Sequence, residues 1–472
     1  MIPVRIFAGR DVAVQGLGLS GIATAKALAL GGANVFAWDD TPKAREAAAA
    51  AGIPLFDLAA ADWSRFAALA LAPGIPLTHP EPHWSVKKAR SAGVEVIGDM
   101  ELFFRERGLH ESPGKVVVIT GTNGKSTTTA LTAHLLSSAG KRVQLGGNIG
   151  KAVLDLESFA PDITYVIELS SFQIDLAPGL KPDAAALLNI TPDHLDRHST
   201  LQNYARIKAQ VFAHLGPDAT AVIGVDDDPS RAIADDLRGP FAVKHIAVGS
   251  PVSTGVWAND GVLVEMEGGK EVARIDLAGI GSLRGAHNWQ NAAVAYALAR
   301  SQGLDSATIA QDLKSFAGLA HRMEQVARSG KVLFVNDSKA TNADAAGKAL
   351  ASFTDIYWII GGRPKEGGLA GLEPFFPKIA RAYLIGEAAE AFARQLGSAV
   401  PYTQCGTLDR AIEAAASDAV RSSAKEPVVL LSPACASYDQ FANFEKRGEA
   451  FREIVMRLNG AESVKPVEGR AA

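Results

Sequence analysis

The sequence predicts an α/β protein of several domains, each built on a mainly parallel β-sheet. Short β-rich segments alternate along the chain with helical, often Ala-rich segments, which is typical of parallel sheets covered by helices. Three of the β-rich segments run directly into a loop that precedes a helical segment. A chain of 472 residues is also too long for one ordinary hydrophobic core, and this length indicates two to four domains.

The composition limits the class of function. Hydrophobic residues make up 47% and charged residues 21% of the chain, which is the balance of a globular protein. The formal net charge of -4 gives no reason to expect nucleic acid or an anionic membrane as a partner. The two cysteines, Cys405 and Cys435, are too few for a disulfide framework and favour a reducing compartment. Neither a signal peptide nor a run of about 18 apolar residues is found. We therefore expect a cytoplasmic protein with no nucleic-acid or membrane partner.

The first predicted strand, 12–15, runs into Gly16-Leu-Gly18-Leu-Ser-Gly21. This glycine spacing is typical of a Rossmann-like turn that binds a pyrophosphate at a helix N-terminus. Asp39 and Asp40 end the next predicted strand, where they could bind the ribose or base of NAD or of a UDP-sugar. The motif alone is a weak signal, and a tight turn without a ligand remains the alternative.

The second predicted strand, 116–120, runs into Gly121-Thr-Asn-Gly-Lys-Ser126 and then an apolar helical segment. A glycine turn before a helix collects backbone N–H groups around one point, and Lys125 adds a positive charge there. Ser126 or Thr127 can offer a hydroxyl to the Mg²⁺ of a nucleotide. The residue six before Lys125 is Ile119, so the loop is a shortened P-loop. A glycine turn with a chance Lys-Ser pair is the alternative to phosphate binding.

Two further strands predict an acidic, metal-binding region. Glu168 ends the buried segment 163–167, and Asp193 and His194 follow the apolar segment that begins at Ala184. Ligands of open parallel sheets lie beyond the carboxyl ends of the strands, so Glu168 is well placed to bind the Mg²⁺ of a nucleotide. A single histidine in a loop is more often a surface residue, and we keep that interpretation for His198.

The later part of the chain predicts one addition to the second sheet and one more domain. Residues 246–277 alternate in short apolar and polar runs, which predicts an antiparallel hairpin appended to the α/β core. A boundary is expected near Gly318, before the strands 332–335 and 357–360. The segment beyond Leu458 has too few apolar residues to pack, and we expect it to be frayed.

Taken together, the motifs resemble those of the Mur ligase family, and specifically of its D-glutamate-adding branch. They occur in the family order from about residue 12 to residue 450. The matching segments are 16–21, 72–75, 121–129, 146–150, 168–173, 193–196, 287–291, 321–322, 336–342 and 431–441.

The resemblance implies a fold of three domains. A Rossmann-like domain (1–112) would bind the UDP substrate, and a P-loop-type ATPase domain (113–319) with the antiparallel addition would bind ATP. A second Rossmann-like domain (320–460) would bind the amino acid, followed by a flexible tail (461–472). The implied reaction joins D-glutamate to UDP-N-acetylmuramoyl-L-alanine through an acyl phosphate in peptidoglycan precursor synthesis. The implied partners are these two small molecules and ATP, acting on a monomer. Because the ligands are divided between domains, closure of the C-terminal domain is expected before chemistry.

The resemblance also implies the site residues. The implied catalytic residues are Lys125, His194 and Lys208. Expected ATP contacts are Gly121, Thr122, Asn123, Gly124, Lys125, Ser126, Thr127, Asn291, Arg322 and Asp337. Expected contacts to the UDP substrate are Gly18, Ser20, Asp40, Thr41, Pro73, Gly74 and Asn148, and Ala72 stands where the family often has Ser. Expected contacts to D-glutamate are Lys339, Thr341, Lys365, Ser432 and Phe441. The sequence of the loop around Lys365 departs from the one that is common in the family. Cys435 is expected to pack in its loop rather than act as a nucleophile.

Two Mg²⁺ ions are expected, with Ser126, Glu168, His194 and Lys208 as protein ligands. Lys208 matches a lysine that family members carry as an N-carboxylate derived from CO₂. A free ammonium about 4 Å from a divalent cation is repelled by roughly 8 kcal/mol at an effective dielectric of about 20. Carboxylation replaces that repulsion with oxygen ligands suited to Mg²⁺. An exposed helix lysine without modification is the alternative.

Two other functions fit parts of the pattern. A sibling Mur ligase, or a related ATP-dependent amino-acid ligase, would use the same ATP-binding motifs with another acceptor. A P-loop regulatory nucleotide switch with an added Rossmann-like module would bind and hydrolyse nucleotide without an acceptor. The base that deprotonates the incoming amine is not singled out by the sequence, and His194 is the candidate.

Overall fold

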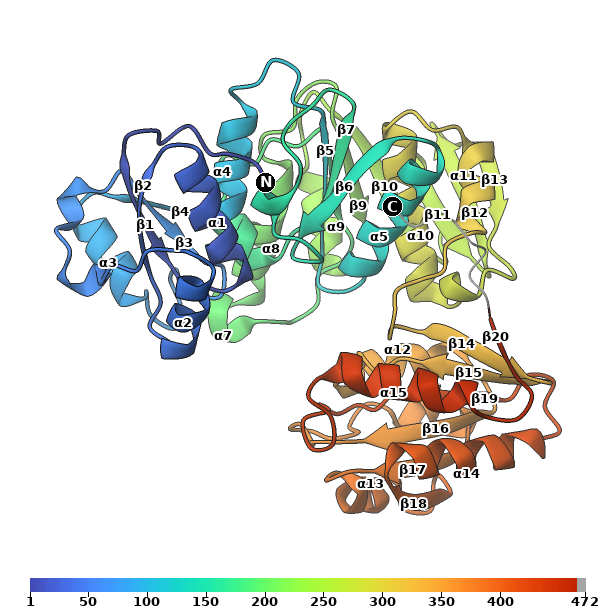
Figure 1. Cartoon of the computed structure of the whole chain (residues 1–472). Coiled ribbons are helices and arrows are strands. Elements are labelled where there is room, and N and C mark those ends of the chain that lie inside the picture. The colour runs from blue at the N-terminus through green and yellow to red at the C-terminus, as the bar shows by residue number, and fades with distance from the viewer. Residues whose placement is uncertain (465–472) are drawn as a thin grey trace. The chain divides into compact units, whose positions relative to one another are not determined.

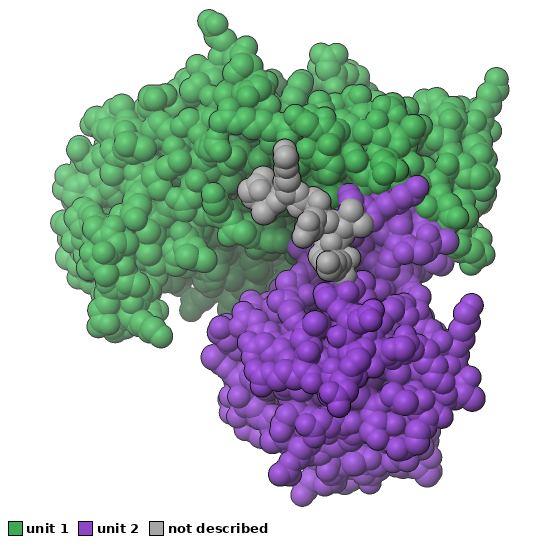
Figure 2. All heavy atoms as spheres, turned by 45° about the vertical axis from the view of Figure 1, so that its right-hand side comes forward, with its two compact units in different colours: residues 1–276, 290–312 green, residues 277–289, 313–472 purple. Residues whose placement is uncertain are grey.

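The computed structural model describes residues 1–464, which form three β-sheets. The chain is divided into two compact units (Figure 2). Unit 1 consists of residues 1–276 and 290–312 and contains the first two sheets, and unit 2 consists of residues 277–289 and 313 onward and contains the third. No helix within residues 1–464 is long and apolar enough to cross a membrane.

The first sheet has four parallel strands in the order β2-β1-β3-β4. Its strands are β1 (Asp11–Gln15), β2 (Asn34–Trp38), β3 (Ala68–Leu71) and β4 (Glu95–Ile97), and its helices are α1 (Leu19–Leu30), α2 (Pro42–Ala50), α3 (Trp84–Ser91) and α4 (Asp99–Arg107), with short turns η1 (Leu58–Ala60) and η2 (Trp63–Arg65). Every residue of β3 is buried, as expected for a strand covered on both faces. The predicted parallel architecture of this part is therefore observed (Figure 1).

The predicted glycine turn joins β1 to α1. Gly16 has φ +93°, a left-handed conformation that favours glycine. A Cβ atom on Gly21 would lie 1.8 Å from the carbonyl oxygen of Gly16, so the first turn of α1 approaches the end of β1 as closely as only glycine allows. Gly18 precedes α1 and is exposed, with open space where its Cβ would be. The turn therefore presents the N-terminus of α1 to solvent.

The second sheet has nine strands in the order β13-β12-β11-β10-β9-β8-β5-β7-β6. Its strands are β5 (Lys115–Thr120), β6 (Arg142–Gly147), β7 (Ile163–Glu168), β8 (Ala184–Leu187), β9 (Thr220–Gly224), β10 (Ala242–Val248), β11 (Gly255–Asn259), β12 (Val262–Glu267) and β13 (Lys270–Asp276). The accompanying helices are α5 (Lys125–Ser138), α6 (Ser171–Asp175), α7 (Leu195–His198), α8 (Leu201–Ala209), α9 (Asp228–Asp236), α10 (Ala286–Ser301) and α11 (Ser306–Leu313), with turns η3 (Val153–Asp155), η4 (Gln210–Phe212) and η5 (Gly281–Leu283). Strands β5 to β11 pair in parallel, and β11, β12 and β13 pair antiparallel, which confirms the antiparallel addition.

One hydrophobic core joins the two sheets of unit 1. It includes Val12 and Val14 of β1 together with Val116 and Val118 of β5. Backbone contacts also connect the two parts, such as the hydrogen bond of 2.8 Å from the N–H of Gly98 to the carbonyl oxygen of Leu176. The sheets that contain β1 and β7 therefore share one hydrophobic core.

The third sheet, in unit 2, has seven strands in the order β18-β17-β16-β19-β15-β14-β20. Its strands are β14 (Glu324–Ser329), β15 (Val332–Asn336), β16 (Ile356–Gly361), β17 (Ile379–Ile385), β18 (Tyr402–Gly406), β19 (Val428–Leu431) and β20 (Ala461–Ser463), and its helices are α12 (Ala343–Ser352), α13 (Ala389–Leu396), α14 (Leu408–Val420) and α15 (Phe444–Met456), with the turn η6 (Glu373–Lys378). The five strands from β15 to β18 in this order pair in parallel, and β14 is antiparallel to β15.

The expectation of a frayed segment beyond Leu458 is wrong for residues 461–463. These residues form β20, which pairs antiparallel with β14. The edge of β14 offers unpaired backbone groups, and backbone pairing needs no apolar side chains, so composition did not reveal this strand. The rest of the predicted tail, residues 465–472, lies outside the described residues.

Candidate active site

The shortened P-loop connects β5 to α5. Gly121 and Gly124 have φ +156° and +84°, and Gly124 has no side chain with which to cap α5. The first N–H groups of a helix have no partner within the helix, so they face the loop with a partial positive charge. The Nζ of Lys125 donates to the carbonyl oxygens of Gly121 at 3.0 Å and Thr122 at 2.9 Å. A positively charged cradle for phosphate oxygens results.

Other elements of unit 1 fix the shape of this loop. A Cβ atom on Gly124 would lie 2.2 Å from the Oδ1 of Asn291 in α10. The hydroxyl of Thr128 donates to the same oxygen at 3.2 Å, and Asn291 is only 2% exposed. The backbone N–H of Asn123 donates to the Oδ1 of Asn189 at 2.9 Å. The structure therefore brings Asn291 to residues 121–127, as predicted, and adds Asn189, which the sequence analysis missed.

Glu168 ends β7 beside the P-loop strand β5, with which β7 pairs. Its side chain is 1% exposed, and its Oε1 accepts a hydrogen bond of 2.7 Å from the Nδ2 of Asn148. Its Oε2 is also buried and has no hydrogen-bond partner. A buried carboxylate oxygen without a partner is costly, and a bound cation would satisfy it. Asn148, a predicted UDP-substrate contact, is thus in direct contact with Glu168, a predicted metal ligand.

Lys208 of α8 is 1% exposed, so the alternative of an exposed helix lysine is wrong. Its Nζ donates to the Oγ1 of Thr120 at 3.2 Å and to the carbonyl oxygen of Gly121 at 2.9 Å, at the base of the P-loop. Burial first, and the charge of Lys125 second, hold the pKa of Lys208 well below its ordinary value. The structure therefore places a lysine that tends to lose its proton beside the phosphate cradle.

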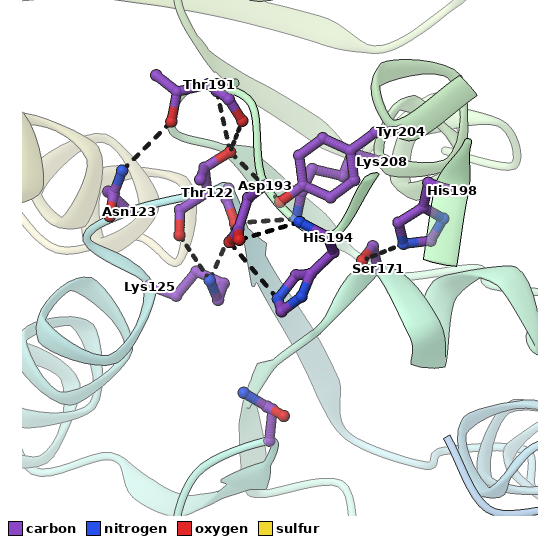
Figure 3. Close-up of polar contacts among 12 residues, drawn as sticks. Thr122, Asn123, Lys125, Ser171, Thr191, Asp193, His194, His198, Tyr204 and Lys208 are labelled. Carbon is purple, nitrogen blue, oxygen red and sulfur yellow. Dashed lines mark hydrogen bonds and ion pairs between the residues drawn. The ribbon is translucent and has the colours of Figure 1, made fainter. Parts of the chain in front are cut away.

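His194 lies in the loop after β8, at φ +51°, and begins α7. Its Nε2 is 3.5 Å from the Oδ2 of Asp193, and its ring centroid is 5.0 Å from that of Phe172. About half of its side chain is exposed. Figure 3 shows the side chains of Lys125, Asp193, His194 and Lys208 in one cluster, contributed by the P-loop, the loop after β8 and α8.

The interpretation of His198 as a surface residue is wrong. His198 is 2% exposed, and its Nε2 lies 2.8 Å from the Oγ of Ser171. Figure 3 shows His198 beside Ser171. The ring of His198 stacks on Phe172 with a centroid separation of 5.2 Å, and its centroid lies 5.3 Å from that of Tyr204. Burial lowers the pKa of His198 to about 4, which keeps the ring neutral. His198 therefore packs the loop after β7 against α8, a contact that sequence spacing does not encode.

The residues of this region fit a magnesium site assembled with phosphate oxygens. Within residues 1–464, no three His, Cys, Asp or Glu side chains gather in a metal-binding arrangement. Glu168 and His194 are two such residues, and a hydroxyl, an N-carboxylated lysine and phosphate oxygens would supply the rest. Mg²⁺ is usually bound through one or two carboxylates plus substrate phosphates. The buried, unpartnered Oε2 of Glu168 is consistent with this kind of site.

Apart from Asn148, which follows β6, the predicted UDP-substrate residues lie around the ends of β1, β2 and β3. Asp39 is used internally, because its carboxylate accepts hydrogen bonds from the backbone N–H groups of Leu17 and Thr41, both at 2.7 Å. Asp40 is half exposed beside the glycine turn. Gly18 and Thr41 are exposed, and Ser20 and Pro73 are half-buried. Of the acidic pair, Asp40 is therefore the residue available to a ligand.

Arg197, which the sequence analysis did not single out, connects this region to Phe172 of α6. Its guanidinium donates to the carbonyl oxygens of Gly74 at 2.9 Å and Ile75 at 3.0 Å, and it stacks over the ring of Phe172 at 4.5 Å. Arg197 belongs to the motif that contains His194, so the motif was the signal that could have identified it. The contact links the segment 72–75, which includes the predicted UDP-substrate contacts Pro73 and Gly74, to α6.

The remaining predicted residues lie in unit 2. Asp337 is 5% exposed and accepts hydrogen bonds from the hydroxyl of Ser432 at 2.9 Å and from the N–H of Met323 at 3.1 Å. Burial raises the pKa of Asp337 to about 7, and the nearby charge of Arg322 opposes this increase. Ser432 is itself fully buried.

The acceptor residues predicted in unit 2 differ in exposure. Lys339 is exposed, and its Nζ lies 4.4 Å from the ring centroid of Phe444, a contact that the sequence did not predict. Thr341 is half-buried, Phe441 packs partly buried against the sheet, and Lys365 is exposed in the loop after β16. Lys339 and Lys365 thus offer their ammonium groups to solvent, whereas the hydroxyl of Ser432 is occupied by Asp337.

Comparison with known proteins agrees with this arrangement. Residues 119–299 match the Mur ligase middle domain, and residues 321–435 match the Mur ligase glutamate ligase domain. The chain is 57% identical over 470 residues to the UDP-N-acetylmuramoylalanine--D-glutamate ligase of Mesorhizobium japonicum, covering 99% of this chain and 100% of that protein. It is 56% identical to the enzyme of the same name from Rhizobium meliloti, covering 98% of this chain and 99% of the relative.

Solved structures show the same fold at low sequence identity. UDP-N-acetylmuramate-alanine ligase MurC from Thermotoga maritima aligns over 94% of this chain and 98% of its own, with a TM-score of 0.56 and 18% identity. A pseudomurein peptide ligase type C from Methanothermus fervidus aligns over 95% of this chain and 99% of its own, with a TM-score of 0.54 and 18% identity. With a P-loop, an α/β fold and near-full-length relatives in agreement, the chain belongs to the Mur ligase family.

Proposed function

We propose that this protein joins D-glutamate to UDP-N-acetylmuramoyl-L-alanine with hydrolysis of ATP to ADP and phosphate, in peptidoglycan precursor synthesis. The observation that carries the proposal is the convergence of Lys125, Glu168 and Lys208 at one edge of the second sheet. That convergence occurs in a chain 57% identical, over almost its whole length, to a ligase named for this reaction. The relatives favour this acceptor over the sibling acceptors and over a regulatory nucleotide switch.

In this proposal, each of three domains binds one substrate. Residues 1–112 bind the UDP substrate, residues 113–319 bind ATP and residues 320–460 bind D-glutamate. The three separate sheets and the family matches at 119–299 and 321–435 support this division. Because all of the proposed substrates are small molecules and one is ATP, we propose that the protein acts as a monomer in the cytoplasm.

The first step transfers phosphate to the substrate. An oxygen of the alanyl carboxylate attacks the γ-phosphorus of ATP, the bond to the β,γ-bridging oxygen breaks, and ADP leaves an acyl phosphate behind. Both reactants are anionic, so their approach needs positive charge. Lys125 and the backbone N–H groups at the N-terminus of α5 supply that charge from this chain. The Oδ1 of Asn291 lies against Gly124, where it leaves no room for a side chain in the loop.

Two Mg²⁺ ions, when bound with the nucleotide, would screen the phosphate charges. Ser126, Glu168, His194 and Lys208 would hold them, Lys208 as an N-carboxylate. The buried position of Lys208 supports this modification, because a depressed pKa leaves the amine neutral, and the neutral amine is the form that adds to CO₂ with loss of one proton. The resulting anion would also remove the repulsion between Lys208 and Lys125.

In the second step, the amine of D-glutamate attacks the acyl carbon, and inorganic phosphate leaves as the amide forms. The ammonium must first lose a proton. His194, when its ring is not bound to a metal ion, is the proposed base, since its half-exposed Nε2 lies 3.5 Å from the Oδ2 of Asp193. Lys339, Thr341, Lys365, Ser432 and Phe441 are proposed to bind the amino acid in unit 2.

The experiment is a phosphate-release assay with UDP-N-acetylmuramoyl-L-alanine, ATP and one acceptor at a time. We expect phosphate release with D-glutamate to be at least about 100-fold faster than with L-alanine, L-glutamate or a diamino acid. A wrong acceptor leaves buried polar groups of the binding site without hydrogen-bond partners, which strongly disfavours it. Mass spectrometry of the product should show the dipeptide. Release at the same rate without any acceptor would support a nucleotide switch, and preference for another acceptor would support a sibling ligase.

A further inference from the structure

Asp40, beside the first glycine turn, is held by side chains from a distant segment. The Nε2 of His83 lies 2.8 Å from Oδ2 of Asp40, and the Nε1 of Trp84 donates to Oδ2 at 3.0 Å and to Oδ1 at 3.3 Å. The Nε2 of Gln15 donates to Oδ1 at 3.4 Å. Three donors from β1 and from the start of α3 therefore converge on one carboxylate at the end of β2.

The other nitrogen of His83 determines which tautomer is present. Its Nδ1 accepts from the backbone N–H of Ser85 at 3.4 Å and lies 2.8 Å from the Oγ of Ser85, so that it caps the N-terminus of α3. With Nδ1 as the acceptor, the hydrogen resides on Nε2 and points to Asp40. His83 is thus bound at both ends and can hold the carboxylate in one rotamer.

The carboxylate is fixed but not enclosed. Half of the Asp40 side chain is exposed, whereas His83 is only 17% exposed. The hydrogen bonds from Trp84 and His83 outweigh the effect of burial and lower the pKa of Asp40, so it stays ionised. A carboxylate that is ionised, oriented and accessible next to a Rossmann-like turn suits a hydrogen-bond donor on the nucleoside of a bound nucleotide.

We propose that His83 and Trp84 are positioning residues of the nucleotide subsite, which hold Asp40 in the orientation that binds the nucleoside part of the UDP substrate. This inference rests on the proposed function, because it deepens the role of Asp40 in the first domain. Preorganisation of the carboxylate lowers the ordering cost of binding, so the pair acts on substrate affinity and not on the chemical step.

Three substitutions separate the two roles of His83 and isolate the role of Trp84. His83→Asn keeps an oxygen that can cap α3 but is too short to reach Asp40. His83→Gln keeps a donor at the reach of Nε2. Trp84→Phe keeps the aromatic ring and removes its N–H. Lys87→Gln, on an exposed side chain one turn along α3 that pairs with Glu81, is the matched control.

The probe is UDP itself, titrated by calorimetry into the full-length chain, together with steady-state kinetics of ligation. His83→Asn and Trp84→Phe should each raise the Kd for UDP and the KM for UDP-N-acetylmuramoyl-L-alanine by about 5- to 30-fold, the range for one misplaced charge-assisted hydrogen bond. The kcat and the KM values for ATP and D-glutamate should change by less than about 2-fold. His83→Gln and Lys87→Gln should stay near the wild type.

Two results would overturn the inference. Unchanged UDP affinity in both His83→Asn and Trp84→Phe would show that Asp40 needs no support. A parallel change of kcat and of all three KM values would show a general structural role. Failure of the wild type to ligate D-glutamate would instead refute the proposed function, and UDP binding would still decide the role of the pair.

Discussion

Buried polar atoms with unusual partners distinguish the residues of the candidate site. The Oε2 of Glu168 is buried without a hydrogen-bond partner, and Lys208 is buried against two oxygen atoms and the charge of Lys125. Such groups lower stability unless a ligand or a modification satisfies them. The incomplete hydrogen bonding of Glu168 and the burial of the Lys208 amine therefore mark these two residues as part of the candidate site.

Replacement of Lys208 with alanine should abolish ligation, with a decrease in kcat of at least about 1,000-fold, because the proposed metal ligand is lost. Added formate or acetate should restore part of the activity by occupying the vacated space. Carbon-13 NMR of the wild type under ¹³CO₂ should show one carbamate signal that is absent from the variant. Full activity of the variant would refute N-carboxylation.

Asp337 predicts a pH-dependent stability. Its pKa is raised from 3.8 to about 7 by burial, so the folded state takes up a proton that the unfolded state lacks, and stability decreases as the pH rises from about 4 through about 7. In Asp337→Asn, the Oδ1 can accept from the N–H of Met323 while the Nδ2 donates to the hydroxyl of Ser432. The stability of this variant relative to the wild type should be roughly 1–3 kcal/mol higher at pH 8.5 than at pH 5. Denaturant titrations at both pH values measure this gain. An equal difference at both pH values would contradict the raised pKa.

At the scale of elements, the candidate site consists of loops that leave the carboxyl ends of parallel strands. β1, β5 and β7 each end in such a loop, and α1 and α5 begin at two of them. Within one sheet, parallel strands deliver their carboxyl ends to the same edge, so the loops after β5 and β7 meet in the second sheet, whereas the loop after β1 belongs to the first sheet. The N-termini of α5 and α1 add partial positive charge at these two places, which suits phosphate-bearing substrates.

The close approach in the first turn predicts a difference between two glycines. A Cβ atom on Gly21 would lie 1.8 Å from the carbonyl oxygen of Gly16, whereas a Cβ atom on Gly18 meets nothing within 4 Å. Gly21→Ala should therefore lower the unfolding free energy of unit 1 by roughly 2–4 kcal/mol. Gly18→Ala should change it by less than about 1 kcal/mol. Chemical denaturation followed by circular dichroism compares the two, and equal losses would contradict the steric argument.

Arg197 predicts a coupling between two loops of unit 1. Arg197→Met keeps an apolar stem for Phe172 but removes the donors to Gly74 and Ile75. The loss of two charge-assisted hydrogen bonds should raise the KM for the UDP substrate by about 10-fold or more and leave the KM for ATP nearly unchanged. Faster proteolysis in residues 72–84 should accompany this change. An unaltered KM for the UDP substrate would show that the loop keeps its shape alone.

At the scale of the whole molecule, the chain forms two units, each with its own buried core. Both cysteines lie in unit 2, are buried and form no disulfide. Five of the six tryptophans lie outside the third sheet, at positions 38, 63, 84, 257 and 289. Because both cysteines lie in unit 2, their thiol reactivity reports on the opening of unit 2.

The thiols should be unreactive in the native protein. Burial raises the pKa of Cys435 to about 12 and also raises that of Cys405, so neither is a thiolate at neutral pH. Ellman's reagent should modify neither within minutes at pH 8 and should modify both in denaturant. A reducing agent should leave the melting temperature unchanged. Rapid modification of either cysteine in the native protein would show that unit 2 opens locally.

The sequence predicted the strands and glycine turns well because their signals are local. Apolar runs at 116–120 and 163–167 favour buried strands, and the glycines at 16 and 124 permit the positive φ angles that their turns need, whatever lies far away in the chain. The burial of His198 was missed, because it depends on Phe172 and Tyr204, which come from other elements. Strand β20 was missed because backbone pairing to β14 leaves no pattern in side chains.

The sequence by itself determined the α/β class, the order of the motifs and the family, because these depend on residue type and spacing along the chain. Only the tertiary structure decided that Lys208 is buried beside the P-loop, that Asp39 is used internally while Asp40 is open, and that His83 and Trp84 hold Asp40. Burial and hydrogen-bond partners depend on which segments meet in space. The packing of parallel strands and helices determines which segments come together, and the spacing of residues along the sequence does not predict these contacts.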